Sequence, residues 1–152
     1  MKRALITGSF DPPTRGHLDL IKRTAALFDR VTVCIFINSE KKYMFSLEKR
    51  TEMLIAMCRE VPNVRVDSFG GLVADYAKKI KADVIVKGAR SGADFEYEAT
   101  ISRVNCTVFP VETVILPTDP TLSHISSTSA RDMIRYGGDL EAFLTPEVIE
   151  LI

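Results

Sequence analysis

Short, unbroken runs of apolar residues alternate along this chain with stretches in which apolar residues recur three or four positions apart. An unbroken apolar run is typical of a parallel strand buried on both faces, whereas the wider spacing is typical of a helix packed on one side. The runs predict strands at residues 4–7, 31–37, 84–86 and 114–116, and Val64-Arg65-Val66 predicts another.

The segments between these runs predict helices. Apolar residues recur at helical spacing over residues 18–28, and Ser46 is a suitable N-cap for a helix whose apolar side includes Ile55. Further helices are predicted through residues 72–80, over much of 95–108 and around 133–134. Because strands alternate with helices, we expect an α/β fold, a single doubly wound, Rossmann-like domain with a five-stranded parallel sheet and helices on both faces.

Ligands of such folds bind in the loops that follow the carboxyl ends of the strands. The first of these loops, residues 8–17, contains a glycine, two prolines and a histidine. Gly8 lets the backbone approach a ligand closely, and the prolines restrict the shape of the loop. His17 would lie at the start of the next helix, where free N–H groups and the helix dipole favour a phosphate. A lone histidine more often packs or caps, but this strand-to-helix setting favours a functional role.

Basic residues follow two other predicted strands. Lys41 and Lys42 come after the second strand, and Lys87, Gly88 and Arg90 lie where the fourth strand ends. Paired lysines are usually only a solvated surface. Their position at the ligand-binding edge of the sheet nevertheless makes phosphate contacts plausible, and the glycine permits close approach of the backbone.

A run of hydroxyl residues, 126–129, precedes the last predicted helix, and Arg131 follows in its first turn. One serine or threonine at a helix start is an ordinary cap. Four in succession exceed what capping needs and suggest a cradle for a polyphosphate. The sequence contains no Walker A motif, no G-x-G-x-x-G motif and no recognisable hydrolase triad.

Composition narrows the class of partner. The 152 residues include 20 lysines and arginines against 20 aspartates and glutamates, so no overall positive field favours a nucleic acid. The three cysteines, Cys34, Cys58 and Cys106, are widely spaced among apolar residues, and we expect them to be reduced, packed thiols of a cytoplasmic protein. The N-terminal apolar run is too short for a signal peptide or a membrane span.

Two segments resemble the signatures of the nucleotidyltransferase superfamily. Residues 8–17, with Thr14-Arg15-Gly16-His17, resemble its T/H-x-G-H signature, and residues 125–128 resemble its I-S-S-[ST] signature. The segments around Lys41, at 87–90 and at 94–98 (Asp-Phe-Glu-Tyr-Glu) are similar to those of the phosphopantetheine adenylyltransferase family in particular. The similarity runs from end to end, and segment 94–98 is its most specific part.

This resemblance implies a single nucleotidyltransferase domain over residues 1–152 that reversibly transfers an adenylyl group from ATP to 4′-phosphopantetheine, as a step of coenzyme A biosynthesis. It implies Mg²⁺ carried on ATP with few protein ligands and no metal-binding residue that can be named, a homohexamer, and no nucleic-acid or membrane partner. The implied catalytic residues are His17, Lys41 and Arg90. The implied ATP-binding residues are Ser9, Phe10, His17, Gly88, Arg90, Glu98, Ser126, Ser127 and Thr128. The implied residues for the second substrate are Ser9, Lys41, Leu72, Val73, Lys87 and Asn105.

Two positions depart from the family pattern. Ser9 replaces the commoner threonine and keeps the hydroxyl, whereas Lys87 replaces the commoner arginine and loses a two-pronged donor while keeping the charge. Two alternative functions remain open at this point. One is a different adenylyl- or cytidylyltransferase of the superfamily, and the other is a nucleotide sensor without turnover, although His17 and Lys41 are both present.

Overall fold

The computed structural model describes residues 1–152 and contains five strands and six α-helices. The strands are β1 (Arg3–Gly8), β2 (Arg30–Phe36), β3 (Val64–Phe69), β4 (Val84–Ala89) and β5 (Glu112–Pro117). The helices are α1 (Arg15–Leu27), α2 (Leu47–Met57), α3 (Val73–Ile80), α4 (Gly92–Val108), α5 (Ser127–Tyr136) and α6 (Pro146–Ile149), with a 3₁₀ turn, η1, at Pro120–Leu122.

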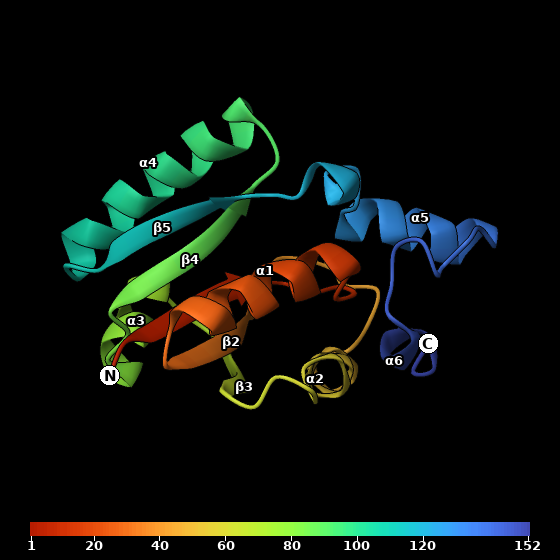
Figure 1. The fold of residues 1–152 in the computed structure, drawn as a ribbon, viewed down its shortest axis with the longest axis horizontal. Helices are drawn as coiled ribbons and strands as arrows, with labels where there is room; N and C mark the ends of the chain where they lie inside the picture. Colours follow the sequence, from red (N-terminus) through yellow and green to blue (C-terminus); the bar gives the residue numbers. More distant parts are fainter.

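All five strands form one parallel sheet in the order β3-β2-β1-β4-β5. The chain therefore builds the sheet in one direction from β1 to β3, crosses over, and continues on the other side of β1 with β4. A crevice forms at this reversal, beyond the carboxyl ends of β1 and β4. Figure 1 shows that α5 lies at the end of the sheet to which the strands point, away from the N-terminus.

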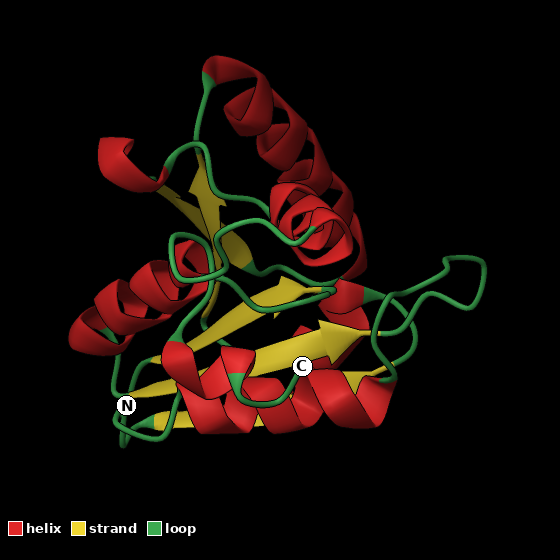
Figure 2. Ribbon diagram, turned by 90° about the vertical axis from the view of Figure 1, so that its right-hand side faces the viewer, coloured by secondary structure: helices red, strands yellow, loops and turns green.

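Helices cover both faces of the sheet, as Figure 2 shows. The larger core lies on the face of α1, α2 and α6, where Ile21, Leu54 and Val148 pack against Val33. The smaller core lies on the face of α3, where Tyr76 and Ala77 pack against strand residues that include Leu5 and Ile85. The predicted doubly wound α/β fold with five parallel strands is confirmed.

Several helices begin and end at recognisable caps. Ser46 caps α2 by accepting a hydrogen bond from the backbone N–H of Lys49, as predicted. Ser126 caps α5 through a reciprocal pair of bonds with Ser129, and Gly137 ends that helix in the left-handed conformation that favours glycine.

Three details differ from the sequence predictions. Leu72 is the N-cap of α3 and lies before the helix proper, where 59% of it is exposed. Ile55 points outward from α2 and is 56% exposed, so its assignment to the apolar side was wrong. Cys34 and Cys58 are buried, but Cys106 is exposed on α4, where its thiol donates to the carbonyl of Val111 over 3.1 Å. No helix is long and apolar enough to span a bilayer.

Candidate active site

A cavity of about 290 Å³ opens at the carboxyl edge of the sheet, at the reversal of strand order. It lies between the ends of β1 and β4, the first turns of α1 and the start of α5. Among its 19 lining residues are the predicted site residues His17, Lys87, Gly88, Arg90, Glu98, Ser126 and Ser127. The fold thus gathers seven predicted residues from four separate segments around one space.

His17 is held at this cavity by the start of α1. Thr14 is the N-cap of the helix and His17 is its third residue, and the two form a reciprocal capping pair. The backbone N–H of Thr14 donates to Nδ1 of His17 over 2.9 Å. Because Nδ1 accepts this bond, it carries no proton in the neutral ring, and the proton sits on Nε2. His17 can therefore offer one N–H donor to a ligand.

The surroundings of His17 keep its ring neutral. Burial lowers the pKa of His17 to about 4, and the positive charges of Lys87 and Arg90 act in the same direction. The ring of Phe10 packs edge-on against the imidazole, with 4.8 Å between the ring centres. Phe10 itself is only 2% exposed, so it could meet ATP only through its backbone. The result is a donor with a defined tautomer and a restricted orientation.

Lys87 lies between this cavity and a smaller one of about 120 Å³. Its Nζ donates to the hydroxyl of Thr7 over 3.4 Å and lies 3.7 Å from the carboxylate of Glu98. Lys87, Thr7 and Glu98 line both cavities, while the predicted residues Val73 and Asn105 line the smaller one. The two cavities are therefore neighbours with a shared basic residue between them.

Arg90 is held in place by Asp94, one turn into α4. The carboxylate of Asp94 accepts from the backbone N–H of Arg90 over 3.0 Å and from its Nε over 3.2 Å. The pKa of Asp94 lies below its usual range, chiefly because of the bond from that backbone N–H. Asp94 thereby fixes the guanidinium of Arg90 beside the cavity.

The start of α5 meets the cavity through backbone groups more than through hydroxyls. The hydroxyl of Ser126 accepts the capping bond from Ser129, and the hydroxyl of Ser127 donates to the carbonyl of Pro12 over 2.9 Å. Thr128 is exposed and does not line the cavity. The N–H groups of Ser127 and Thr128 have no helical partner because they begin the helix, so these are its free anion donors.

Three further predicted residues lie outside both cavities. The Nζ of Lys41 donates to the hydroxyl of Ser9 over 3.3 Å, so these two residues form a polar pair outside the cavities. Leu72 is largely exposed and lines neither cavity. The structure therefore brings Lys41 and Ser9 together but leaves the side chain of Leu72 outside both cavities.

Sequence reasoning missed residues that complete the site. Asp19 and Arg23 of α1 form an ion pair of 3.3 Å at the cavity, and Thr118 lines it from the loop after β5. Thr118 could have been found, because every loop after a strand on this edge was a candidate. Asp19 and Arg23 could not, because a pair four residues apart on a helix is an ordinary surface feature.

The charges around the larger cavity are balanced within the protein. Each of its cations has a carboxylate partner, in the pairs Arg23–Asp19, Lys87–Glu98 and Arg90–Asp94. These carboxylates hold the cations at defined places. No group of three or more His, Cys, Asp or Glu side chains is arranged to hold a metal ion.

A doubly wound sheet with an uncharged donor histidine, basic residues and helix-start amides around the reversal of strand order is the arrangement of a nucleotidyltransferase. The family described as Cytidylyltransferase-like matches residues 5–133, most of the chain. A phosphopantetheine adenylyltransferase of Streptomyces coelicolor is 41% identical over 152 residues, covering 100% of this chain and 96% of that protein. Its counterpart in Flavobacterium psychrophilum is 45% identical over 151 residues, covering 99% of each chain. The chain therefore belongs to the phosphopantetheine adenylyltransferase family.

A solved structure supports the fold independently of these relatives. A Vibrio parahaemolyticus protein, provisionally identified as a nicotinate-nucleotide adenylyltransferase, superposes with a TM-score of 0.73 over 99% of this chain and 98% of its own. Its sequence identity is 22%, so the likeness concerns the fold alone.

Proposed function

We propose that this protein transfers the adenylyl group of ATP to the phosphate of 4′-phosphopantetheine, reversibly forming dephospho-coenzyme A and pyrophosphate. The observation that carries the proposal is the geometry of His17, a neutral donor beside a cavity that Lys87 and Arg90 also line. Full-length similarity to relatives that bear the name of this activity supports the choice of acceptor.

The reaction needs no protein base. The attacking atom is a phosphate oxygen of 4′-phosphopantetheine, and a phosphate monoester is already largely ionised at neutral pH because its second pKa is about 6. It forms a bond to the α-phosphorus of ATP as the bond from that phosphorus to the pyrophosphate oxygen breaks. Catalysis then consists of aligning two polyanions and stabilising the charge that develops between them.

His17 would stabilise that charge by donating from Nε2 to an oxygen of the α-phosphate. A neutral imidazole donates one directed hydrogen bond, and its occupied Nδ1 prevents the ring from flipping without loss of the helix cap. Such preorganised donors are more effective in the transition state than in the ground state, because the oxygen gains charge as the reaction proceeds.

The departing pyrophosphate would bind at the opposite side of the cavity from the acceptor. Arg90 and the free N–H groups of Ser127 and Thr128 are the donors available there, and Gly88 admits a phosphate close to the backbone. Ser126 would contribute by capping the helix that supplies these N–H groups, and Phe10 by holding the imidazole of His17.

The acceptor would bind through its phosphate and its pantetheine arm. Lys41 and Ser9 would hold the phosphate, and Lys87 would neutralise repulsion between the two substrates from its place between the cavities. Val73 and Asn105 border the smaller cavity, which suits a narrow arm. Leu72 would join them only if its exposed side chain covers the bound arm. Glu98 would set the position of Lys87 through their ion pair.

Mg²⁺ would enter as part of the nucleotide. Small divalent cations of this kind commonly keep several waters and bind mainly to substrate phosphates. The carboxylates nearest the cavity are engaged with Arg23, Lys87 and Arg90, so the phosphates of ATP are the best available ligands.

We further propose a homo-oligomer, which the family resemblance implies to be a hexamer, working in the cytoplasm. None of the residues of α4 is buried, yet Tyr97, Ile101, Val104 and Val108 form one apolar stripe at helical spacing on its surface. A second copy of the chain would cover this stripe. Three free cysteines suit a reducing compartment.

Pyrophosphate release from ATP in the presence of Mg²⁺ tests the function. 4′-Phosphopantetheine, nicotinate mononucleotide and glycerol phosphate are compared as acceptors, with His17→Ala as the negative control. Release with 4′-phosphopantetheine alone is expected. Release with one of the other acceptors would transfer the activity to another member of the superfamily, and nucleotide binding without release would favour a sensor.

A further inference from the structure

Arg50 of α2 is an almost completely buried cation without an ion-pair partner. It is 2% exposed. Its Nη1 donates to the carbonyl of Ser9 over 2.9 Å and its Nε donates to the carbonyl of Phe45 over 3.1 Å. The ring of Tyr43 covers the guanidinium, with its centre 3.9 Å from Cζ. A buried arginine is usually matched by a carboxylate, so this set of neutral partners calls for an explanation.

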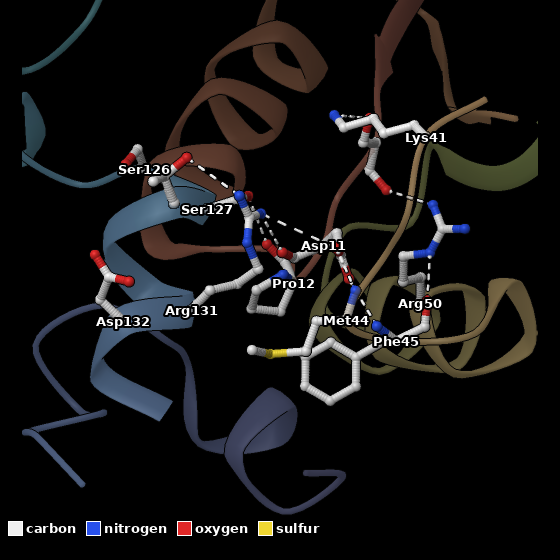
Figure 3. A network of polar contacts seen from close by, with 12 residues as sticks. Asp11, Pro12, Lys41, Met44, Phe45, Arg50, Ser126, Ser127, Arg131 and Asp132 are labelled. Carbon is white, nitrogen blue, oxygen red and sulfur yellow. Dashed lines mark hydrogen bonds and ion pairs between the residues drawn. The ribbon is translucent and has the colours of Figure 1, made fainter. Parts of the chain in front are cut away.

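Asp11 connects the same two loops from the other side. It is 3% exposed, and its carboxylate accepts from the backbone N–H groups of Met44 and Phe45 over 2.8 and 2.9 Å. Arg131 approaches from α5 and donates to the backbone carbonyl of Asp11 over 2.8 Å. In Figure 3, Asp11 lies in the centre of the network, with Arg131 on one side and Arg50 on the other.

These contacts tie the loop after β1 to the loop before α2. The first loop carries Ser9, and the second carries Lys41. The side chain of Lys41 is exposed and has a single hydrogen bond, the 3.3 Å contact to Ser9. Its Nζ also lies 5.6 Å from the centre of the Tyr43 ring, which itself covers Arg50. The position of Lys41 therefore depends on the backbone of the two loops and on Tyr43, and Arg50 is the side chain that donates directly to a carbonyl in each loop.

We propose that Arg50 is a positioning residue that sets the spacing between Ser9 and Lys41 and thereby controls how tightly the phosphate of the acceptor is held. This proposal rests on the function proposed above, because it assigns the Ser9–Lys41 pair to the phosphate of 4′-phosphopantetheine. Arg50 does not line either cavity, so it acts through these two residues and not by touching substrate.

The chemistry of the side chain explains why an arginine is needed here. The planar guanidinium offers donors in a rigid fork, so it can reach two carbonyls in different directions while its face stacks on an aromatic ring. A lysine has the same charge but a single ammonium group at the end of a flexible stem, so it cannot hold both carbonyls and the Tyr43 ring in one geometry. Arg50→Lys therefore removes the simultaneous contacts to the two carbonyls and the Tyr43 ring and keeps the charge.

The test compares Arg50→Lys with Arg59→Lys, a matched exchange at an exposed arginine just beyond the same helix, for which no side-chain contact is present. For each variant, kcat and the KM values for ATP and 4′-phosphopantetheine are measured together with the melting temperature. A lost hydrogen bond from a charged donor corresponds to about a 10- to 100-fold change. We expect Arg50→Lys to raise the KM for 4′-phosphopantetheine about tenfold or more, to leave the KM for ATP within about twofold, and Arg59→Lys to change neither.

Two results would overturn the positioning role. One is an unchanged KM for 4′-phosphopantetheine, and the other is a fall in melting temperature with both KM values preserved, which is the signature of a purely structural arginine. If Arg50→Lys does not fold, Tyr43→Leu decides, with Tyr43→Phe as its control. Leucine removes the ring over Arg50 and should raise the same KM by a few-fold, whereas phenylalanine keeps the ring and loses only the hydroxyl that accepts from the backbone N–H of Asn38 over 3.2 Å. Equal KM values in these two variants would refute the proposal.

The wild-type protein separates this inference from the function on which it rests. If the wild type turns over 4′-phosphopantetheine and Arg50→Lys behaves like it, only the positioning role fails. If the wild type does not turn over this acceptor at all, the proposed function fails, and the role of Arg50 toward that acceptor fails with it.

Discussion

His17 both caps helix α1 and lines the cavity, and a series of substitutions can separate these two roles. His17 lies at the third position of α1, where its Nδ1 caps the backbone N–H of Thr14, and it also lines the cavity with its remaining donor. His17→Ala removes both functions. Glutamine at the third helical position is a standard capping-box residue, because its side-chain oxygen reaches back to the N-cap N–H. His17→Gln should therefore restore the cap without restoring the directed Nε2 donor.

The magnitudes follow from the two functions. Loss of one preorganised donor to a developing oxyanion lowers kcat by about 10²- to 10³-fold, equivalent to about 2.7–4 kcal/mol. Loss of a helix cap costs about 1 kcal/mol of stability, which lowers the melting temperature by about 2–4 °C in a chain of this size. We expect His17→Ala to show both effects. His17→Gln should recover most of the melting temperature and little of the kcat.

The assay is pyrophosphate release at saturating ATP and 4′-phosphopantetheine, with the Kd for ATP and the melting temperature measured on the same preparations. ATP binding should change little, because the donor acts mainly in the transition state. A kcat for His17→Ala within about threefold of the wild type would refute the role of His17 as the α-phosphate donor. A large loss of ATP affinity with preserved kcat would make it a ground-state binding residue instead.

Three other predictions concern titration, charge and assembly. The chain has 2 histidines, so NMR of the ligand-free protein, with His17→Gln for assignment, should show His17 as the Nε2–H tautomer at pH 7 with a pKa of about 4. Because this pKa is depressed in the folded state, the stability of the protein should fall as the pH drops from about 6.5 to 4. Titration of His17 near pH 6.5 would contradict the geometry. Lys87→Met should raise the KM for both substrates by about tenfold, since Lys87 borders both cavities and its loss leaves Glu98 unpaired. A change in the KM for only one substrate would assign Lys87 to that substrate alone. Val104→Glu should shift the mass measured by light scattering to that of smaller species, whereas Ile55→Glu, at an apolar position that is likewise 56% exposed, should not; unchanged mass in both would exclude the α4 stripe as the contact.

The central strands β1, β2 and β4 could be predicted from the sequence because they are buried between the helix layers on both faces of the sheet. Such strands appear as unbroken apolar runs, and the residues that follow them mark the ligand-binding edge. That reasoning located His17, Lys87 and Arg90, which the structure brings to one cavity. Local signals also identified Ser46 as a helix cap, because capping depends only on neighbouring residues.

The network behind the site could not be predicted in this way. Asp11 and Arg50 are charged residues in polar surroundings of the sequence, and nothing local distinguishes them from surface charges. Their burial results from contacts between segments 33 to 41 residues apart. The hydroxyls of residues 126–129 show the converse limit. Their clustering at a helix start is visible in the sequence, and the capping bond of Ser126 is local, but the bond of Ser127 to the carbonyl of Pro12 depends on tertiary geometry.

Misjudged exposure has a physical cause too. Ile55 and Cys106 are apolar residues within helices, and apolar helix positions are usually covered. Here α4 has no buried residue, and α2 presents Ile55 to the outside. Apolar side chains that the fold leaves uncovered can be recognised only once the packing partners of each helix are known.

Following the α-phosphorus and the γ-phosphorus of ATP into the products tests the proposed chemistry most directly. ATP labelled at the α-phosphorus, and separately at the γ-phosphorus, is incubated with the protein, Mg²⁺ and 4′-phosphopantetheine, and the products are separated. Attack on the α-phosphate places the α-label in dephospho-coenzyme A and the γ-label in pyrophosphate. A γ-label recovered on the pantetheine product, or an α-label released as free AMP without acceptor adduct, would contradict adenylyl transfer at this site.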